Sequence, residues 1–130
     1  MTQQELAQLY FDYLEAEGYR PEMEEGFVRF KSDGGTYLIV VDEDDEQYFR
    51  MIFPNFWPIE SEEERRKVLV AADHATSETK VAKVFTVRDN VWATIEIFCA
   101  EPQEFQAIFS RAMRALKAGV RTFLDKMRED

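Results

Sequence analysis

Three segments of the chain place apolar residues at helical spacing, which predicts three helices. In the first, over about residues 3–17, apolar side chains recur at i, i+3, i+4, i+7 and i+8, namely Leu6, Leu9, Tyr10, Tyr13 and Leu14. Thr2 and Glu5 have capping-box spacing at its start, and Gly18 is placed to end it in a left-handed conformation. A second helix is expected over about 62–79, after another capping-box pattern at Ser61-Glu62-Glu63-Glu64.

The third predicted helix begins at Pro102, a usual first-turn position for proline, and runs to Met127. At 1.5 Å per residue its length is roughly 39 Å. A five-residue strand is only about 17 Å long, so we expect the helix to outrun the sheet. Its last turns would then expose four apolar side chains in a monomer: Val120, Phe123, Leu124 and Met127.

Between the helices, β-branched and aromatic runs predict five strands, over 27–31, 37–41, 47–53, 81–87 and 91–99. Ser32-Asp33-Gly34-Gly35 is expected to be a tight turn, with paired glycines supplying the positive φ angles. The run 37–41 is apolar on both faces, which favours a central place in the sheet. The order α-β-β-β-α-β-β-α predicts an α+β fold with an antiparallel sheet packed by helices. At 130 residues, we expect a single domain over 1–130.

Charge is unevenly distributed over this acidic chain, whose formal net charge is −10. Residues 1–64 hold 17 acids and 4 bases (−13), whereas residues 65–130 hold 9 acids and 12 bases (+3). A negative field disfavours binding to nucleic acid and to anionic membranes. No apolar run approaches the roughly 20 residues that span a bilayer. The polar, acidic start lacks the features of a secretory signal, so we expect a cytoplasmic protein with no nucleic-acid or membrane partner.

The residue types that carry chemistry are sparse, and we expect neither an enzyme nor a bound metal or cofactor. One Cys and one His exclude an internal disulfide framework and the usual zinc sites. The acidic turn 42–46 lacks the ligand spacing of an EF-hand and is interpreted as a solvated turn. His74 follows Asp73 directly, and helix neighbours point about 100° apart, so His74 is expected at a surface or interface. Cys99 is expected to pack as a small apolar group.

An aromatic group at 48–57 and 92 has two interpretations that the sequence leaves open. The residues are Tyr48, Phe49, Phe56, Trp57 and Trp92. They either pack in the core and beneath a loop, or form an exposed patch that grips a peptide.

Three segments carry a resemblance to a known family: Pro54-Asn55-Phe56-Trp57-Pro58-Ile59, Thr79-Lys80-Val81-Ala82-Lys83-Val84 and Asn90-Val91-Trp92-Ala93. With the element order and the acidic balance, the chain resembles the YbjN family over about residues 3–125. Members of that family are described as bacterial regulators of sensory transduction. Their fold is similar to that of class I type III secretion chaperones, which are small, acidic, cytoplasmic and dimeric.

This resemblance implies a homodimer that binds an extended protein or peptide client through apolar grooves and pairing at sheet edges. The implied dimer surface is Val68, Ala72, Ala75 and Val84, and the implied client groove is Phe49, Met51, Phe53 and Trp92. Whether dimerisation uses the second helix or the overhanging third helix stays open. YbjN-like proteins occur without a secretion apparatus, so a secretion client is not implied.

Two functions of different classes follow from these observations. The first is a non-enzymatic, homodimeric protein-binding module, a chaperone-like or regulatory adaptor protein. The alternative is a small-molecule sensor that holds a ligand between sheet and helices near Tyr37, Phe49 and Trp92, which would need a cavity there.

Overall fold

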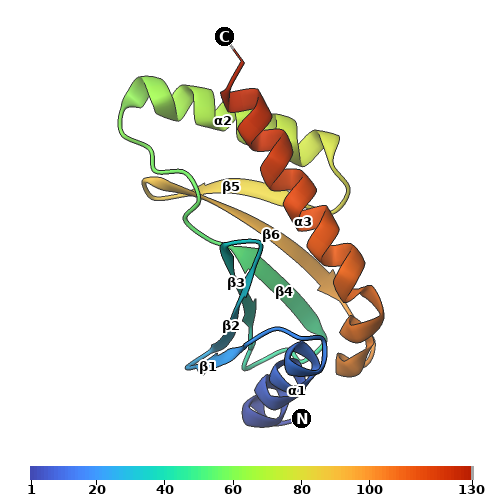
Figure 1. Cartoon of the computed structure of the whole chain (residues 1–130). Helices are drawn as coiled ribbons and strands as arrows, with labels where there is room; N and C mark the ends of the chain where they lie inside the picture. Colours follow the sequence, from blue (N-terminus) through green and yellow to red (C-terminus); the bar gives the residue numbers. More distant parts are fainter. Residues whose placement is uncertain (130) are drawn as a thin grey trace. The chain divides into compact units, whose positions relative to one another are not determined.

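The computed structural model describes residues 1–129 and has the predicted α+β fold, with three α-helices and a six-stranded antiparallel sheet (Figure 1). The strand order is β1-β2-β3-β4-β6-β5. The elements in chain order are α1 (Gln3–Ala16), β1 (Glu22–Glu24), β2 (Phe27–Ser32), β3 (Gly35–Val40), β4 (Tyr48–Phe53), α2 (Glu62–Glu78), β5 (Lys83–Val87), β6 (Asn90–Phe98), a short 3₁₀ helix (Pro102–Glu104) and α3 (Phe105–Met127).

The chain forms two compact units, which are described separately below. Unit 1 comprises Met1–Ile52 and Glu96–Phe109, and unit 2 comprises Phe53–Ile95 and the chain from Ser110 onward. That residues 1–130 form a single domain stays a prediction.

In unit 1, both ends of α1 form as the sequence predicts. The Thr2 hydroxyl accepts a hydrogen bond from the Glu5 amide at 3.1 Å, and the Glu5 carboxylate accepts one from the Thr2 amide at 2.8 Å. Gly18 has φ +96°. The amides of Gly18 and Tyr19 donate to the carbonyls of Glu15 and Leu14. This is a Schellman motif, in which a left-handed residue lets the chain satisfy the last helical carbonyls.

The first strands differ from the prediction in two details. β1 was not predicted, because Glu-Met-Glu has no apolar alternation; it pairs with β2 as an edge strand. The β2–β3 turn does not use paired glycines. Asp33 (φ 50°) and Gly34 (φ 82°) have the positive angles, and Gly35 is already the first residue of β3, opposite Ser32. Aspartate tolerates the left-handed region, so this turn needs only one glycine.

The core of unit 1 lies on one face of its strands, where alternate residues are buried: Val28, Phe30, Tyr37, Ile39, Phe49 and Met51. Aromatic rings from α1 and from the start of α3 pack against them. Phe105 stacks on Phe49 with ring centroids 5.4 Å apart and meets Tyr10 edge to face at 4.9 Å. As predicted, β3 lies inside the sheet, between β2 and β4.

In unit 2, α2 packs its small-residue face inward. The Ser61 hydroxyl accepts the Glu64 amide at 3.0 Å, but the Glu64 carboxylate accepts the Glu60 amide, so only half of the predicted capping box forms. Val68, Ala71, Ala72 and Ala75 are buried. β5 begins at Lys83 rather than at residue 81, because Val81 has a left-handed φ of 72° that interrupts the extended chain.

The prediction that four apolar residues at the end of α3 are exposed is wrong for two of them. Phe123 is fully buried and Met127 is buried, while Val120 and Leu124 are half-buried. Phe123 is covered by the proline-flanked loop after β4, where the rings of Phe56 and Trp57 meet it edge to face at 5.4 and 5.9 Å. About one turn before Phe123 in α3, Gly119 approaches Ala82 so closely that a Cβ placed on the glycine would lie 2.6 Å from the alanine Cβ.

Candidate functional site: a pocket beside the edge strand of unit 1

Half of the client groove implied by the resemblance is not accessible. Phe49 and Met51 are buried core residues, because the odd-numbered positions of β4 face α1 and α3. The other two groove residues belong to unit 2 and are half-buried. There the Trp92 indole donates a hydrogen bond to Asn55 at 2.9 Å, and Phe53 stacks on Phe56. The four residues therefore do not form one exposed groove.

The implied dimer surface is also inaccessible. Val68, Ala72, Ala75 and Val84 are all buried. The small side chains of α2 let the helix lie close to β5 within the same unit, and this internal packing uses the surface expected for a partner.

The even-numbered residues of β4 lie on the sheet face opposite the core of unit 1. The Tyr48 hydroxyl donates a hydrogen bond to the Glu96 carboxylate, and Arg50 lies 3.8 Å from the same carboxylate. Partial burial and the Glu96 carboxylate raise the pKa of Tyr48 to about 12, so the phenol stays a neutral donor. Beside it, Phe98 is 78% exposed, with its ring 5.8 Å from that of Tyr48.

Two of the residues considered for catalysis or metal binding, Asp42 and Cys99, have structural roles. Asp42 accepts the amides of Asp44 and Asp45, so its carboxylate orders the acidic turn. In residues 1–129, no group of three or more His, Cys, Asp or Glu side chains is placed to hold a metal ion. Cys99 is buried, and burial raises the pKa of its thiol, as expected for a packing residue. His74 is half-buried on α2.

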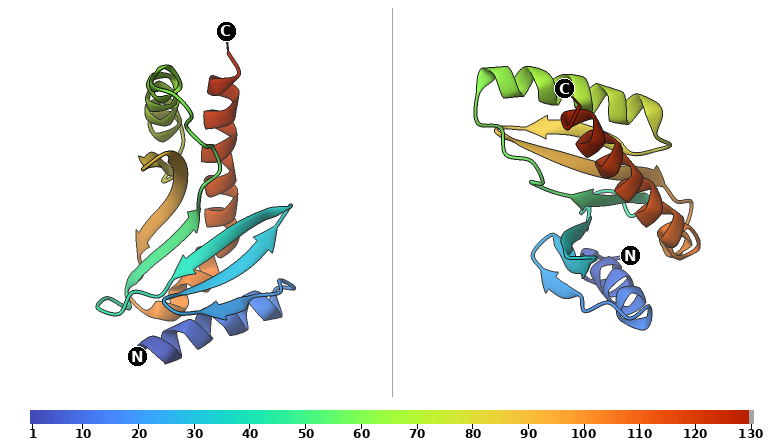
Figure 2. Two further views of the ribbon diagram at one scale, coloured as in Figure 1. Left: turned by 90° about the vertical axis from the view of Figure 1, so that its left-hand side faces the viewer. Right: turned by 45° about the horizontal axis from the view of Figure 1, so that its top comes forward.

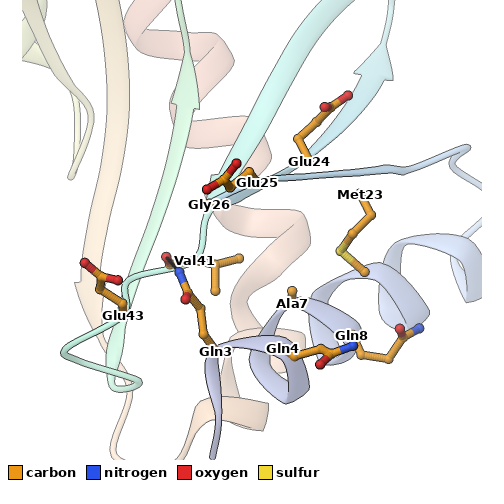
Figure 3. A pocket seen from close by; sticks show the side chains of 10 residues that line it. All are labelled: Gln3, Gln4, Ala7, Gln8, Met23, Glu24, Glu25, Gly26, Val41 and Glu43. Carbon is orange, nitrogen blue, oxygen red and sulfur yellow. Dashed lines mark hydrogen bonds between the residues drawn. The ribbon is translucent and has the colours of Figure 1, made fainter.

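A pocket in unit 1 lies between α1 and β1 (Figure 3). Its volume is about 730 Å³. The side chains around it come from α1, from β1 and the β1–β2 turn, and from the chain after β3: Gln3, Gln4, Ala7, Gln8, Met23, Glu24, Glu25, Gly26, Val41 and Glu43. Three of the ten are glutamates, three are glutamines, and none is a lysine or arginine. The pocket is therefore acidic and rich in amide groups.

The backbone of β1 beside this pocket has a free edge. Glu24 and Phe27 close a two-residue turn, and Glu22 is opposite Arg29. Such closing pairs exchange both backbone hydrogen bonds, and so does every second pair along an antiparallel ladder. Met23 lies between these two hydrogen-bonded pairs. Its amide and carbonyl therefore point away from β2. Met23 is 44% exposed.

On the other edge strand, β5, a side chain occupies the outward backbone groups of one residue, Val84. Val87 and Asn90 close its turn with β6, so the backbone groups of Val84 point to the outer edge. The Thr76 hydroxyl of α2 accepts the Val84 amide at 2.9 Å and donates to the Val84 carbonyl at 3.2 Å. The threonine therefore occupies both outward backbone groups of Val84; the same alternation directs the amide and carbonyl of Thr86 to this edge as well.

Sequence reasoning missed this pocket for a physical reason. β1 has no apolar period, and the pocket combines residues 3–8, 23–26 and 41–43, which only the fold brings together. The one available signal was Pro21 followed by alternating Glu and Met, because proline and charged residues are common on edge strands.

Neither a scan against protein-family models nor a search of curated proteins finds a match to this chain. Across residues 1–129, no helix has both the length and the apolar character needed to cross a membrane.

Proposed function

We propose that this protein is a non-enzymatic, cytoplasmic protein-binding module that takes an extended client segment along β1, in the pocket beside α1. The observation that carries the proposal is the difference between the two sheet edges. On β5 the Thr76 hydroxyl occupies the outward amide and carbonyl of Val84, whereas on β1 the Met23 amide and carbonyl point outward beside a pocket of about 730 Å³. Strand addition at such an edge supplies main-chain hydrogen bonds, and neighbouring pockets select side chains.

The pocket favours a basic client. Glu24, Glu25 and Glu43 line it, and Glu24 is also 2.9 Å from Arg29. Lysine or arginine side chains on alternate positions of the client would meet these carboxylates. The glutamine amides of α1 can donate to and accept from the client backbone. Electrostatic complementarity of this kind contributes mainly to specificity and to the association rate.

The proposal includes the homodimer that the YbjN resemblance implies, but with a different surface. The α2 and β5 surface expected from the sequence is buried inside unit 2, and so are Phe123 and Met127 of α3, so we place the dimer contact on another apolar surface. Phe98 is the most exposed large apolar side chain that the structure describes, and the Tyr48 ring beside it extends the patch. A twofold interface would place this patch against its own copy. Replacement of Phe98 by serine should then yield a monomer by light scattering, whereas a wild-type monomer at micromolar concentration contradicts the dimer.

The alternative function, a small-molecule sensor, has less support. Tyr37 and Phe49 are buried in the packed core of unit 1, Trp92 is half-buried in unit 2, and none of the three lines the pocket beside β1.

The test uses a labelled peptide of alternating lysine and valine and two variants of one residue. Met23→Pro removes the outward amide and leaves the β1–β2 ladder intact, since proline is accepted at edge positions whose N–H faces outward. Met23→Leu is the matched control that keeps the amide. We expect the proline variant to bind the peptide at least about tenfold more weakly by fluorescence anisotropy, and the leucine variant to bind like the wild type. Equal binding by Met23→Pro and the wild type, with circular dichroism unchanged, contradicts the proposal.

A further inference from the structure

A second groove lies in unit 2, between α2 and the last turns of α3, which run close together in this unit (Figure 2). Its volume is about 350 Å³. Six residues line it: Arg66, Lys67, Val70, Lys126, Met127 and Glu129. A groove of this size accommodates one large side chain with its neighbouring backbone.

The apolar part of this groove is formed by Val70 and Met127. Val70 is 61% exposed, so its side chain is accessible to a guest in the groove. Met127 is buried, and its flexible thioether side chain can adapt to an apolar guest.

The rim of the groove is cationic. The lining includes three basic side chains, those of Arg66, Lys67 and Lys126, and one carboxylate. That carboxylate, of Glu129, lies 3.2 Å from the Lys126 ammonium. The surrounding unit has the same sign: unit 2 contains 12 basic and 10 acidic residues (+2), whereas unit 1 contains 4 basic and 16 acidic residues (−12). The positive field is therefore local, and it occurs in a chain whose total charge is negative.

From this combination we infer that the groove binds an acidic peptide segment with one large apolar side chain. The apolar side chain lies on Val70 and Met127, and carboxylates on either side meet Arg66, Lys67 and Lys126. The proposal is independent of client binding at β1, because it uses other residues, another unit and a partner of opposite charge.

The chain offers matched controls for both parts of this site. Val70→Asp places a carboxylate on the groove floor, and Leu69→Asp makes the same change at an exposed aliphatic residue of α2 that does not line the groove. Arg66→Glu reverses a rim charge, and Arg111→Glu makes the same change at an exposed position of α3 outside the groove. All four side chains lie at the surface, so each variant is expected to fold.

The probe is a fluorescein-labelled peptide with a central leucine between glutamates, titrated with the full chain at low and at high salt. We expect Val70→Asp and Arg66→Glu each to weaken binding at least about tenfold, the two controls to change it little, and salt to weaken it. A peptide with serine in place of leucine should also bind weakly. Equal effects of groove and control variants overturn the proposal, and so does no loss on the serine exchange, or tighter binding of a single-stranded DNA oligonucleotide than of the peptide.

Discussion

The two edge strands of the sheet differ in how the chain treats their outward backbone groups. At β5 the Thr76 hydroxyl of α2 hydrogen-bonds both the amide and the carbonyl of Val84. At β1 the corresponding groups of Met23 point outward beside an acidic pocket. Natural sheets usually protect their edges, because an unprotected edge templates unwanted pairing. An edge that is short, charged and next to a pocket is suited to controlled pairing with a partner, and that difference is the basis of the proposed function.

The units that contain these edges also differ in charge and in packing. Unit 1 has a net charge of −12 and an aromatic core around Phe105, whereas unit 2 has +2 and packs Phe123 under Phe56 and Trp57. The variants below test, from the largest expected effect to the smallest, how far the units and their edges behave independently.

Removal of one core ring from each unit should have the largest effect. Phe105→Ala and Phe123→Ala each delete a fully buried ring, and we expect each to lower the free energy of unfolding by about 3–5 kcal/mol. Chemical denaturation followed by circular dichroism gives the values. A single transition that shifts equally in both variants indicates one cooperative domain, as predicted from the sequence. Two transitions, each sensitive to one variant, contradict that prediction.

Gly119→Ala should destabilise unit 2 by about 1–3 kcal/mol, because the new methyl group overlaps Ala82 at 2.6 Å. The higher helix propensity of alanine offsets part of this cost. The double variant Gly119→Ala/Ala82→Gly relieves the overlap and should recover part of the loss in thermal denaturation. No recovery would show that the close approach is not the cause.

Thr76→Val keeps the shape of the side chain but removes the hydroxyl that hydrogen-bonds Val84 at the edge of β5. Two backbone groups of Val84 lose a partner, which should cost about 1–2 kcal/mol. The opened edge should also increase self-association in sedimentation experiments. Thr76→Ser is the control, since it retains the hydroxyl. If Thr76→Val is as stable and as little associated as Thr76→Ser, then the two edges do not differ in the way described here.

The smallest expected effect is a pH dependence in unit 1. The pKa of Tyr48 is raised to about 12 by burial and by its hydrogen bond to Glu96, so the folded protein favours the neutral phenol. Its contribution to stability is complete below the usual tyrosine pKa of about 10 and is lost as the pH rises toward about 12. Tyr48→Phe should flatten that part of the stability profile. If the profile of Tyr48→Phe matches that of the wild type, the loss of stability at alkaline pH comes from other tyrosines.

The sequence predicted most of the elements but not which of their faces are accessible. Alternation over β4 identifies a strand but not which face is covered, because a shift of one residue moves every side chain to the other face; Phe49 and Met51, expected in a groove, are buried. The small-residue stripe of α2 was recognised, but its partner is β5 of the same chain rather than a second copy. The aromatic group at 48–57 and 92 was predicted either as core and loop packing or as an exposed patch; Phe49 is core, and Phe56 and Trp57 form a loop that covers Phe123.

The features missed from the sequence all depend on contacts between distant segments. The cover over the end of α3 comes from residues more than fifty positions earlier, so helix length alone suggested an overhang that does not exist. Thr76 has no special sequence context, and only the packing of α2 beside β5 gives its hydroxyl a role.

Amide hydrogen exchange resolved by residue, with and without the lysine–valine peptide, is the most direct test of the difference between the edges. In the free protein, we expect fast exchange at the outward Met23 amide and slow exchange at the Val84 amide, which hydrogen-bonds the Thr76 hydroxyl at 2.9 Å. When the peptide binds, exchange at Met23 should slow and exchange at Val84 should not change. Protection of Val84 alone, or no change at Met23 under saturating peptide, would contradict strand addition at β1.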